Sequence, residues 1–259
     1  MSLLSWIIVF SLLGGIASVI AAAVFLLFPD RIRLALLPHF VSFAIGALLG
    51  AAFLALIPHA MGNAHAMEYH ELGLTLLLGI LGFFLMEKLV LWRHCHENHC
   101  EAHAVQEHDH NQAAGTLVFI GDAIHNLVDG VLIAAAFMTD THLGVITALA
   151  VAAHEIPQEV GDFAILLHSG YTRGKAFVLN ILASVATVIG ALVAYFSLNS
   201  AQEIVPYVLA IAASSFIYIA VADLIPGLHK HVAFRETVRQ IALIVAGIVV
   251  IFFAHATLH

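Results

Sequence analysis

The chain has 259 residues, of which 62% are hydrophobic and only 10% are charged, and its mean hydropathy is +1.01. Soluble domains carry about 25% charged residues, so this composition excludes an ordinary soluble protein and indicates one embedded in lipid. The formal net charge is −8, and the nine Lys and Arg residues form no patch, which argues against nucleic-acid binding. At about 20 residues per span, residues 1–259 form a single transmembrane domain with no room for a separate soluble one.

Eight apolar segments follow one another along the chain. They cover 4–28, 40–58, 72–91, 116–138, 143–167, 176–198, 204–225 and 237–255. No basic residue precedes the first segment, and Arg31 and Arg33 follow it, which is typical of a retained span rather than a cleaved signal. We therefore predict an all-α polytopic membrane protein with eight transmembrane helices.

The basic residues predict the orientation. They are Arg31, Arg33, Lys88, Arg93, Arg173, Lys175, Lys230, Arg235 and Arg239. All of them lie at the ends of odd-numbered segments, in the loops that follow, or at the start of the next segment. The positive-inside rule then predicts both termini outside the cytoplasm and the loop 92–115 inside. We expect the membrane to be the cell membrane. Because both cysteines, Cys95 and Cys100, lie in that loop, no structural disulfide is expected.

The second and seventh segments end alike and run in opposite directions. One ends Leu56-Ile57-Pro58 and the other Leu224-Ile225-Pro226. The match suggests an inverted repeat, with spans 1–3 and 6–8 arranged around central spans 4 and 5, a common plan in secondary transporters.

Six carboxylates occur within or near the predicted spans. They are Asp122, Asp129, Glu155, Glu159, Asp162 and Asp223. Each costs roughly 2.5–3.5 kcal/mol near the centre of a span. No span interior contains a Lys or Arg, so the compensating cation has to be a metal ion, protons or both.

Helical spacing concentrates the polar residues of the fourth and fifth segments. His125 and Asp129 are four residues apart and share one helix face. Two stripes run along the fifth segment, one of His154, Gln158 and Asp162 and the other of Glu155, Glu159 and Asp162. Pro157 lies among them and predicts a kink, which either shapes the site, the favoured interpretation, or serves only helix packing. This mixed set of nitrogen and oxygen ligands suits Zn²⁺, Fe²⁺ or Mn²⁺ better than Cu⁺.

These residues carry a resemblance to a known family. His125-Asn126-x-x-Asp129-Gly130 and the stretch HEIPQEVGD at 154–162 resemble the two signature motifs of the ZIP (Zrt/Irt-like) metal transporters. The longer motif is similar to that of the subfamily with histidine-rich segments. The resemblance also covers the eight-span layout, the outer termini, the His-rich loop and the Pro-His pair at the end of the second span.

The resemblance implies a binuclear site between spans 4 and 5. One metal would be held by His125, Asp129, His154 and Gln158, and an adjacent one by Asn126, Glu155 and either Asp129 or Asn180. Glu159 and Asp162 complete the set of candidate ligands. The family moves divalent metals toward the cytoplasm by an elevator-like displacement of helix groups and commonly forms homodimers. Zn²⁺ is then the leading substrate, with Fe²⁺, Mn²⁺ and Cd²⁺ as further candidates.

Three departures from the family pattern affect these expectations. Gln158 stands where the subfamily usually has His, which weakens zinc selectivity and leaves iron and manganese open. Pro226 is followed by Gly227 rather than by an acid, and the subfamily's Cys-Pro-Ala motif is absent. The resemblance is thus to the family more than to the subfamily.

Other functions fit less well. His154-Glu155-x-x-Gln158 is similar to the start of the H-E-x-x-H motif of zinc hydrolases, so an intramembrane zinc-dependent hydrolase is the main alternative. The missing second histidine opposes it, and we expect no enzymatic activity. A proton or sodium carrier would leave the two intramembrane histidines unexplained, and a haem-binding electron carrier would need paired axial histidines.

The remaining polar residues have more than one interpretation. The loop 93–110 holds six histidines and both cysteines, which favours a metal-collecting segment over a plain linker. His59, His65 and His70 crowd the first outside loop, as ion collectors at the entrance or as ordinary interface residues. Asp122 and Asp223 are further transport sites, proton acceptors or partners in contacts between spans.

Overall fold

The computed structural model describes residues 1–62, 67–94, 107–229 and 233–258, and these residues form helices and no β-strand. In chain order the elements are α1 (Leu3–Leu12), η1 (Leu13–Ala17), α2 (Ser18–Phe25), α3 (Asp30–Ala51), η2 (Ala52–Leu56), α4 (Ile57–Gly62), α5 (Tyr69–His94), α6 (Glu107–Thr139), α7 (Thr141–His168), α8 (Arg173–Leu198), η3 (Gln202–Ile204), α9 (Val205–Tyr218), η4 (Ile219–Leu224), α10 (Ile225–Leu228) and α11 (Phe234–Leu258). Each predicted apolar segment coincides with one continuous helical run, so the all-α fold class is confirmed. Most of the His-rich loop, including both cysteines, lies outside the described residues, as does His65.

Seven helical runs in the described part of the chain are long and apolar enough to cross a membrane. The long helix that is not apolar enough by this measure is α7, although its 28 residues give it a length of about 42 Å at the usual rise of ~1.5 Å per residue. Its polar residues from His154 to Asp162 make it less apolar than the others. A multi-pass helical protein is therefore shown, and the count of eight spans stays a prediction.

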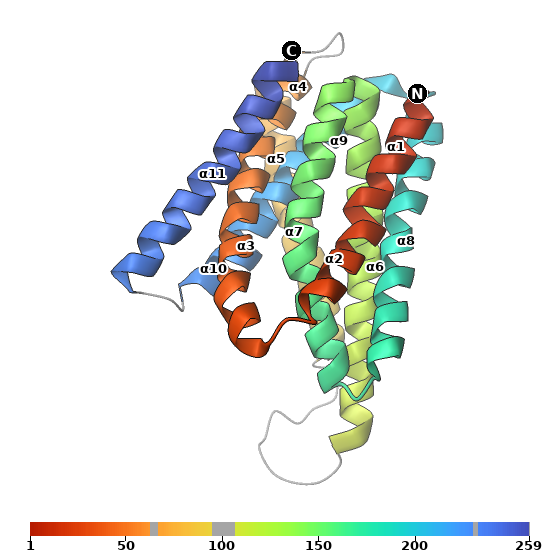
Figure 1. Cartoon of the computed structure of the whole chain (residues 1–259). Coiled ribbons are helices and arrows are strands. Elements are labelled where there is room, and N and C mark those ends of the chain that lie inside the picture. Colours follow the sequence, from red (N-terminus) through yellow and green to blue (C-terminus); the bar gives the residue numbers. More distant parts are fainter. Residues whose placement is uncertain (63–66, 95–106, 230–232, 259) are drawn as a thin grey trace.

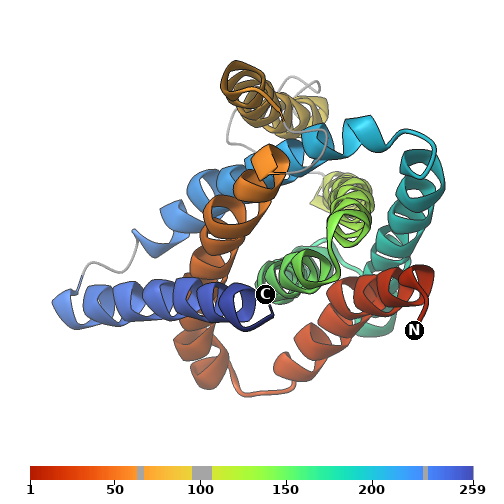
Figure 2. The same cartoon turned by 90° about the horizontal axis from the view of Figure 1, so that it is seen from above.

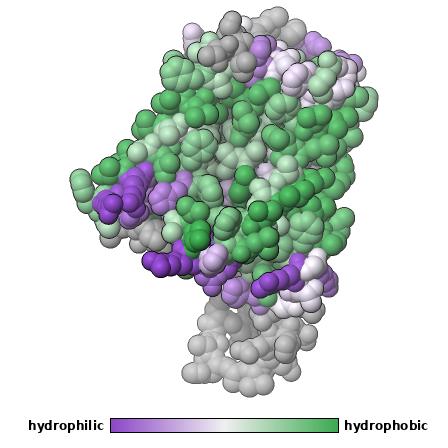
Figure 3. Space-filling model, in the orientation of Figure 1, coloured by the Kyte–Doolittle hydropathy of each residue, from purple (hydrophilic) through white to green (hydrophobic). Residues whose placement is uncertain are grey.

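The two motif-bearing helices lie in the middle of the bundle. Figure 2 shows α6 and α7 enclosed by α1–α2, α3, α8 and α9, with α5 and α11 on the outside. In the most apolar 18-residue stretch of each helix, only 6% of α5 and 11% of α11 are buried, whereas 61% is buried in the run from α3 to α4. Apolar side chains cover most of the face in Figure 3, and hydrophilic ones gather toward its ends. The outer helices thus present the surface expected to face lipid.

Close backbone contacts divide the bundle into two helix groups. A Cβ atom on Gly130 of α6 would lie 1.9 Å from the Thr187 carbonyl oxygen of α8, and one on Gly46 of α3 would lie 2.0 Å from the Ile244 carbonyl oxygen of α11. Only glycine permits such contact between helix backbones. The first group comprises α1, α2, α6, α7 and α8, and the second group comprises α3, α4, α5, α9, α10 and α11. The contact of α3 with α7 is the most extensive one between the groups.

Both termini lie at the same end of the bundle (Figure 1). A chain that crosses a membrane an even number of times has its termini on the same side. The connections at 26–29 and 169–172 lie at the opposite end. They adjoin basic residues that the positive-inside rule assigns to the cytoplasmic side. The π-helical turns η2 and η4 directly precede Ile57-Pro58 and Ile225-Pro226. Matching turns occur where the sequence suggested an inverted repeat, which itself stays a prediction.

Candidate metal centre between α6 and α7

A tight turn sets the register of α6 against α7. Asp140 caps α7, because its Oδ1 accepts hydrogen bonds from the backbone N–H groups of His142, at 2.8 Å, and Leu143, at 3.1 Å. The helices therefore begin their antiparallel packing directly from this cap. As a result, the polar residues of α6 and those of α7 reach the same depth in the bundle.

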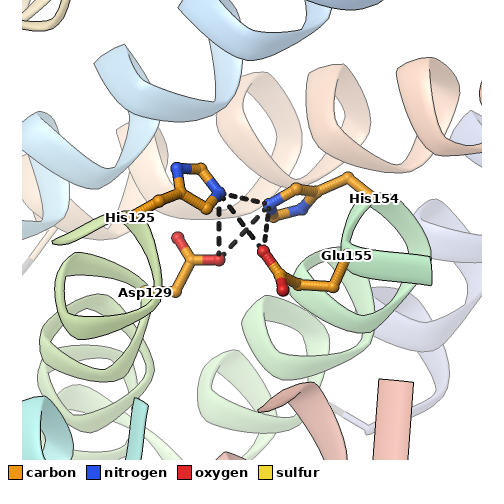
Figure 4. A group of neighbouring side chains, drawn as sticks. All are labelled: His125, Asp129, His154 and Glu155. Carbon is orange, nitrogen blue, oxygen red and sulfur yellow. Dashed lines mark hydrogen bonds and ion pairs between the residues drawn. The ribbon is translucent and has the colours of Figure 1, made fainter. Parts of the chain in front are cut away.

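Two imidazoles and two carboxylates converge there (Figure 4). They belong to His125 and Asp129 of α6 and to His154 and Glu155 of α7, and we call them the histidine–carboxylate cluster. One ligand atom from each lies within 4.8 Å of the other three. The two Nε2 atoms are 3.2 Å apart, with Glu155 Oε1 3.3 Å from His125 Nε2 and Asp129 Oδ2 3.3 Å from His154 Nε2. The remaining two imidazole–carboxylate distances are 3.8 Å within α6 and 3.6 Å within α7.

The surroundings of this cluster favour a bound cation. The side chains of Asp129, His154 and Glu155 are at most 1% exposed, whereas that of His125 is 17% exposed. All four carboxylate oxygens of Asp129 and Glu155 lack a hydrogen-bond partner. A buried carboxylate costs several kcal/mol unless its charge is compensated, and beside neutral imidazoles these two stay uncompensated until a cation or protons arrive.

His154 is oriented by its own helix. Its Nδ1 lies 3.1 Å from the carbonyl oxygen of Ala150, so a proton on Nδ1 is donated to the backbone and the lone pair of Nε2 points at the cluster. A backbone carbonyl that accepts from the far nitrogen is the usual support of a metal-binding histidine.

A second group of acids adjoins the first. Asp122 of α6 joins Glu155 and Glu159 of α7, again with one ligand atom from each within 4.8 Å of the others. We call these three residues the carboxylate cluster, and all three are buried. Both oxygens of Glu159 lack a hydrogen-bond partner. Glu155 belongs to both clusters, so a metal in one would lie next to a metal in the other.

The structure gives the two asparagines different surroundings. Asn126 is held from both sides, because its Nδ2 donates to Asp122 Oδ1 at 2.9 Å and its Oδ1 accepts from Thr187 Oγ1 at 2.6 Å. It therefore positions Asp122. Asn180 of α8 is 2% exposed and its Nδ2 has no hydrogen-bond partner.

A cavity of about 450 Å³ reaches the centre between the two helix groups. Its polar lining comes from Asp122, His125, Gln158 and Asp162 of the first group and from Glu87, Ser215, Tyr218 and Asp223 of the second. Gln158 and Asp162 thus line the cavity beside His125. Pro157 also lines it, while α7 continues through the proline as one helix.

Glu87 is a cavity residue that the sequence reasoning did not find. The hydroxyl of Tyr218 donates a hydrogen bond to its carboxylate, which links α5 to α9. In the sequence Glu87 directly precedes Lys88 at the end of an apolar segment, where a charged pair normally lies in the interface. The predicted segment 72–91 already contained Glu87, and that position was the available signal.

The fold is that of a polytopic helical membrane protein, and its buried histidines and carboxylates form groups that could hold a metal ion. The profile of the family described as ZIP Zinc transporter matches residues 2–255, and the chain belongs to this family. Similar proteins are the zinc transporter ZIP13 of Pongo abelii, 32% identical over 226 residues, and that of Homo sapiens, 30% identical over 257 residues. The zinc transporter zipt-7.2 of Caenorhabditis elegans is 30% identical over 266 residues.

These alignments cover 83–84% of this chain and 65%, 69% and 58% of the three relatives, respectively. The chain therefore spans about two thirds of the length of the curated relatives it matches. The family and these relatives carry the names of transporters, so the expectation of no enzymatic activity is confirmed and the hydrolase alternative is not favoured.

Proposed function

We propose that this protein moves Zn²⁺ across a membrane and that the histidine–carboxylate cluster is the position where the ion is held in transit. The observation that carries the proposal is the buried convergence of two imidazoles and two carboxylates within 4.8 Å. Bonds of about 2.0–2.1 Å to a tetrahedral Zn²⁺ place neighbouring ligand atoms roughly 3.3 Å apart. Three of the distances between the cluster's atoms are 3.2–3.3 Å. The side chains are thus already spaced for this ion.

The charge of the cluster also matches a divalent cation. Asp129 and Glu155 together supply two negative charges, and the neutral imidazoles supply nitrogen ligands. Fe²⁺ and Mn²⁺ accept the same ligand types, so zinc is the leading substrate within a wider set that includes Cd²⁺. Gln158, on the cavity side of His125, adds a neutral oxygen donor.

We propose a second metal position on the carboxylate cluster. Its three acids are oxygen donors, which hard divalent ions prefer and Zn²⁺ tolerates when water completes its shell. This set differs from the one that the sequence suggested, since Asp122 and Glu159 replace Asn126 as direct ligands. Asn126 instead holds Asp122 in place. Asn180 and Asp162 remain candidate ligands beside the two proposed metal positions.

Transport toward the cytoplasm fits the position of the cavity. The cavity leads from His125 toward the end of the bundle opposite the termini, where the positive-inside rule predicts the cytoplasm. Its walls come from both helix groups, so a displacement of the first group against the second would change access to the clusters. An elevator-like movement is therefore the proposed mechanism. A homodimer in the cell membrane would use the apolar outer faces of α5 and α11.

Uptake of radioactive zinc into proteoliposomes tests the proposal. His125→Ala and His154→Ala should each lower uptake at least tenfold, because loss of a direct ligand costs no less than the 10–100-fold typical of outer-sphere changes. His168→Ala is the matched control, since this exposed histidine at the end of α7 lies outside both clusters. Unchanged uptake in both cluster variants would refute the assignment. Competition with Fe²⁺, Mn²⁺ and Cd²⁺ then ranks the substrates.

A further inference from the structure

Two more histidines meet at the end of the bundle that carries the termini. His59 follows Pro58 in α4, and His255 lies in the last turn of α11. Their ring centroids are 5.4 Å apart at an interplanar angle of 76°. The rings of His125 and His154 are related in nearly the same way, at 5.5 Å and 88°. We call His59 and His255 the outer histidine pair.

The ring of His59 is set by its backbone. Its Nδ1 lies 2.8 Å from the carbonyl oxygen of Ala55, so in the neutral ring a proton on Nδ1 is donated there and the lone pair resides on Nε2. His154 of the histidine–carboxylate cluster has the same contact with the carbonyl four residues earlier. The turn η2 precedes this segment, and π-helical turns are frequent at functional sites.

The outer histidine pair is accessible and lies in a favourable electrostatic setting. Both side chains are half-buried, so neither is sealed in the core. Exposed acids at the same end include Glu68, Glu71 and Glu203, whereas the positive-inside pattern assigns the basic residues to the other end. An excess of negative charge raises the local concentration of cations.

We propose that the outer histidine pair is a separate binding site for Zn²⁺, in which the two imidazoles hold the ion and water completes the tetrahedron. Imidazole is the neutral ligand that Zn²⁺ accepts most readily. Because α4 continues the run of α3, and α3 packs backbone to backbone on α11, the site lies within the second helix group and keeps its shape when the first group moves. With two protein ligands among the residues that the structure describes, it binds zinc more weakly than the four-ligand cluster, as suits a position that captures ions and releases them again.

The experiment measures zinc bound per purified chain by equilibrium dialysis, in a His125→Ala/His154→Ala background that disables the histidine–carboxylate cluster. Adding His59→Ala or His255→Ala should remove one zinc ion per chain or weaken its binding at least tenfold. His142→Ala is the matched control, because this histidine lies at the same end of the bundle on α7. Equal zinc binding with and without His59 and His255 would overturn the proposal, whatever happens to transport.

A rescue variant guards against loss of folding. His255→Cys supplies a thiolate in place of the imidazole, so it should restore the ion and shift the preference toward Cd²⁺. In otherwise wild-type protein, removal of the outer histidine pair should raise the zinc concentration for half-maximal uptake while the maximal rate is unchanged. A lower maximal rate with an unchanged half-maximal concentration would contradict a capture site.

Discussion

Replacing Glu155 with glutamine tests whether one carboxylate serves both metal positions. Glu155→Gln keeps the shape of the side chain and removes its charge. Glu155 Oε1 lies 3.3 Å from His125 Nε2, and the same side chain belongs to the carboxylate cluster. Both positions therefore lose an anionic ligand at once.

The magnitude follows from this shared position. If the loss of one ligand weakens one ion by about 10–100-fold, or about 1.4–2.7 kcal/mol, then Glu155→Gln lowers the product of the two binding constants by roughly 10²–10⁴. Glu159→Gln and Asp129→Asn each touch one cluster, so each should lower that product by only about 10–100-fold. The two single-cluster variants are thus the matched controls.

Competition titration against a fluorescent zinc chelator yields both binding constants for the wild type and the three variants. The shared-ligand model requires both constants to fall in Glu155→Gln and only one to fall in each control. If Glu155→Gln changes a single constant, or changes no more than Glu159→Gln does, then the two clusters do not share a ligand.

Three further predictions concern packing, metal-linked stability and access. Gly130→Ala places a methyl group against the Thr187 carbonyl oxygen and should lower the stability of the detergent-solubilised protein by at least about 1–3 kcal/mol, whereas Gly82→Ala meets no atom within 4 Å and should have little effect in the same thermal unfolding assay. Zinc at 100 times its dissociation constant should stabilise the protein by about 2.7 kcal/mol. A His125→Ala/His154→Ala variant that gained as much at the same zinc concentration would show that the histidine–carboxylate cluster is not the source of this stabilisation. Val118 lines the cavity. In a chain whose Cys95 and Cys100 are replaced by serine, Val118→Cys should react with a charged thiol reagent added from the cytoplasmic side. Labelling only from the side of the termini would contradict the proposed direction of transport.

Much of the helical layout was accessible from sequence because the lipid environment imposes it. Apolar stretches of about 20 residues have few structures available in a bilayer, so each predicted segment became a helical run. Three members of the histidine–carboxylate cluster, His125, Asp129 and His154, were expected together. Glu155 was expected at the adjacent metal, and Gln158 was expected in the place that Glu155 takes. What the sequence could not supply was the rotation of α7 about its axis.

The face of α7 that carries His154 extends along the helix beyond the cluster. Gln158 and Asp162 lie one and two turns from His154, about 6 and 12 Å along α7, and they line the cavity. Glu155, one position from His154, faces the cluster instead. Asp122 and Glu87 were harder to assign, because their roles depend on contacts between helices. Local pattern also does not reveal the π-helical turns, which shift the side chains that follow.

The modest apolarity of α7 has a consequence for how the protein is made. A helix with three acids and a proline in its second half gains less from entering lipid than its neighbours do. Joined to α6 by the short Asp140 turn, it is expected to enter the bilayer together with α6 as a hairpin, with its acids facing the partner helix from the start. Variants at this turn would then show their effect during biogenesis, as chains in which α7 remains outside the membrane.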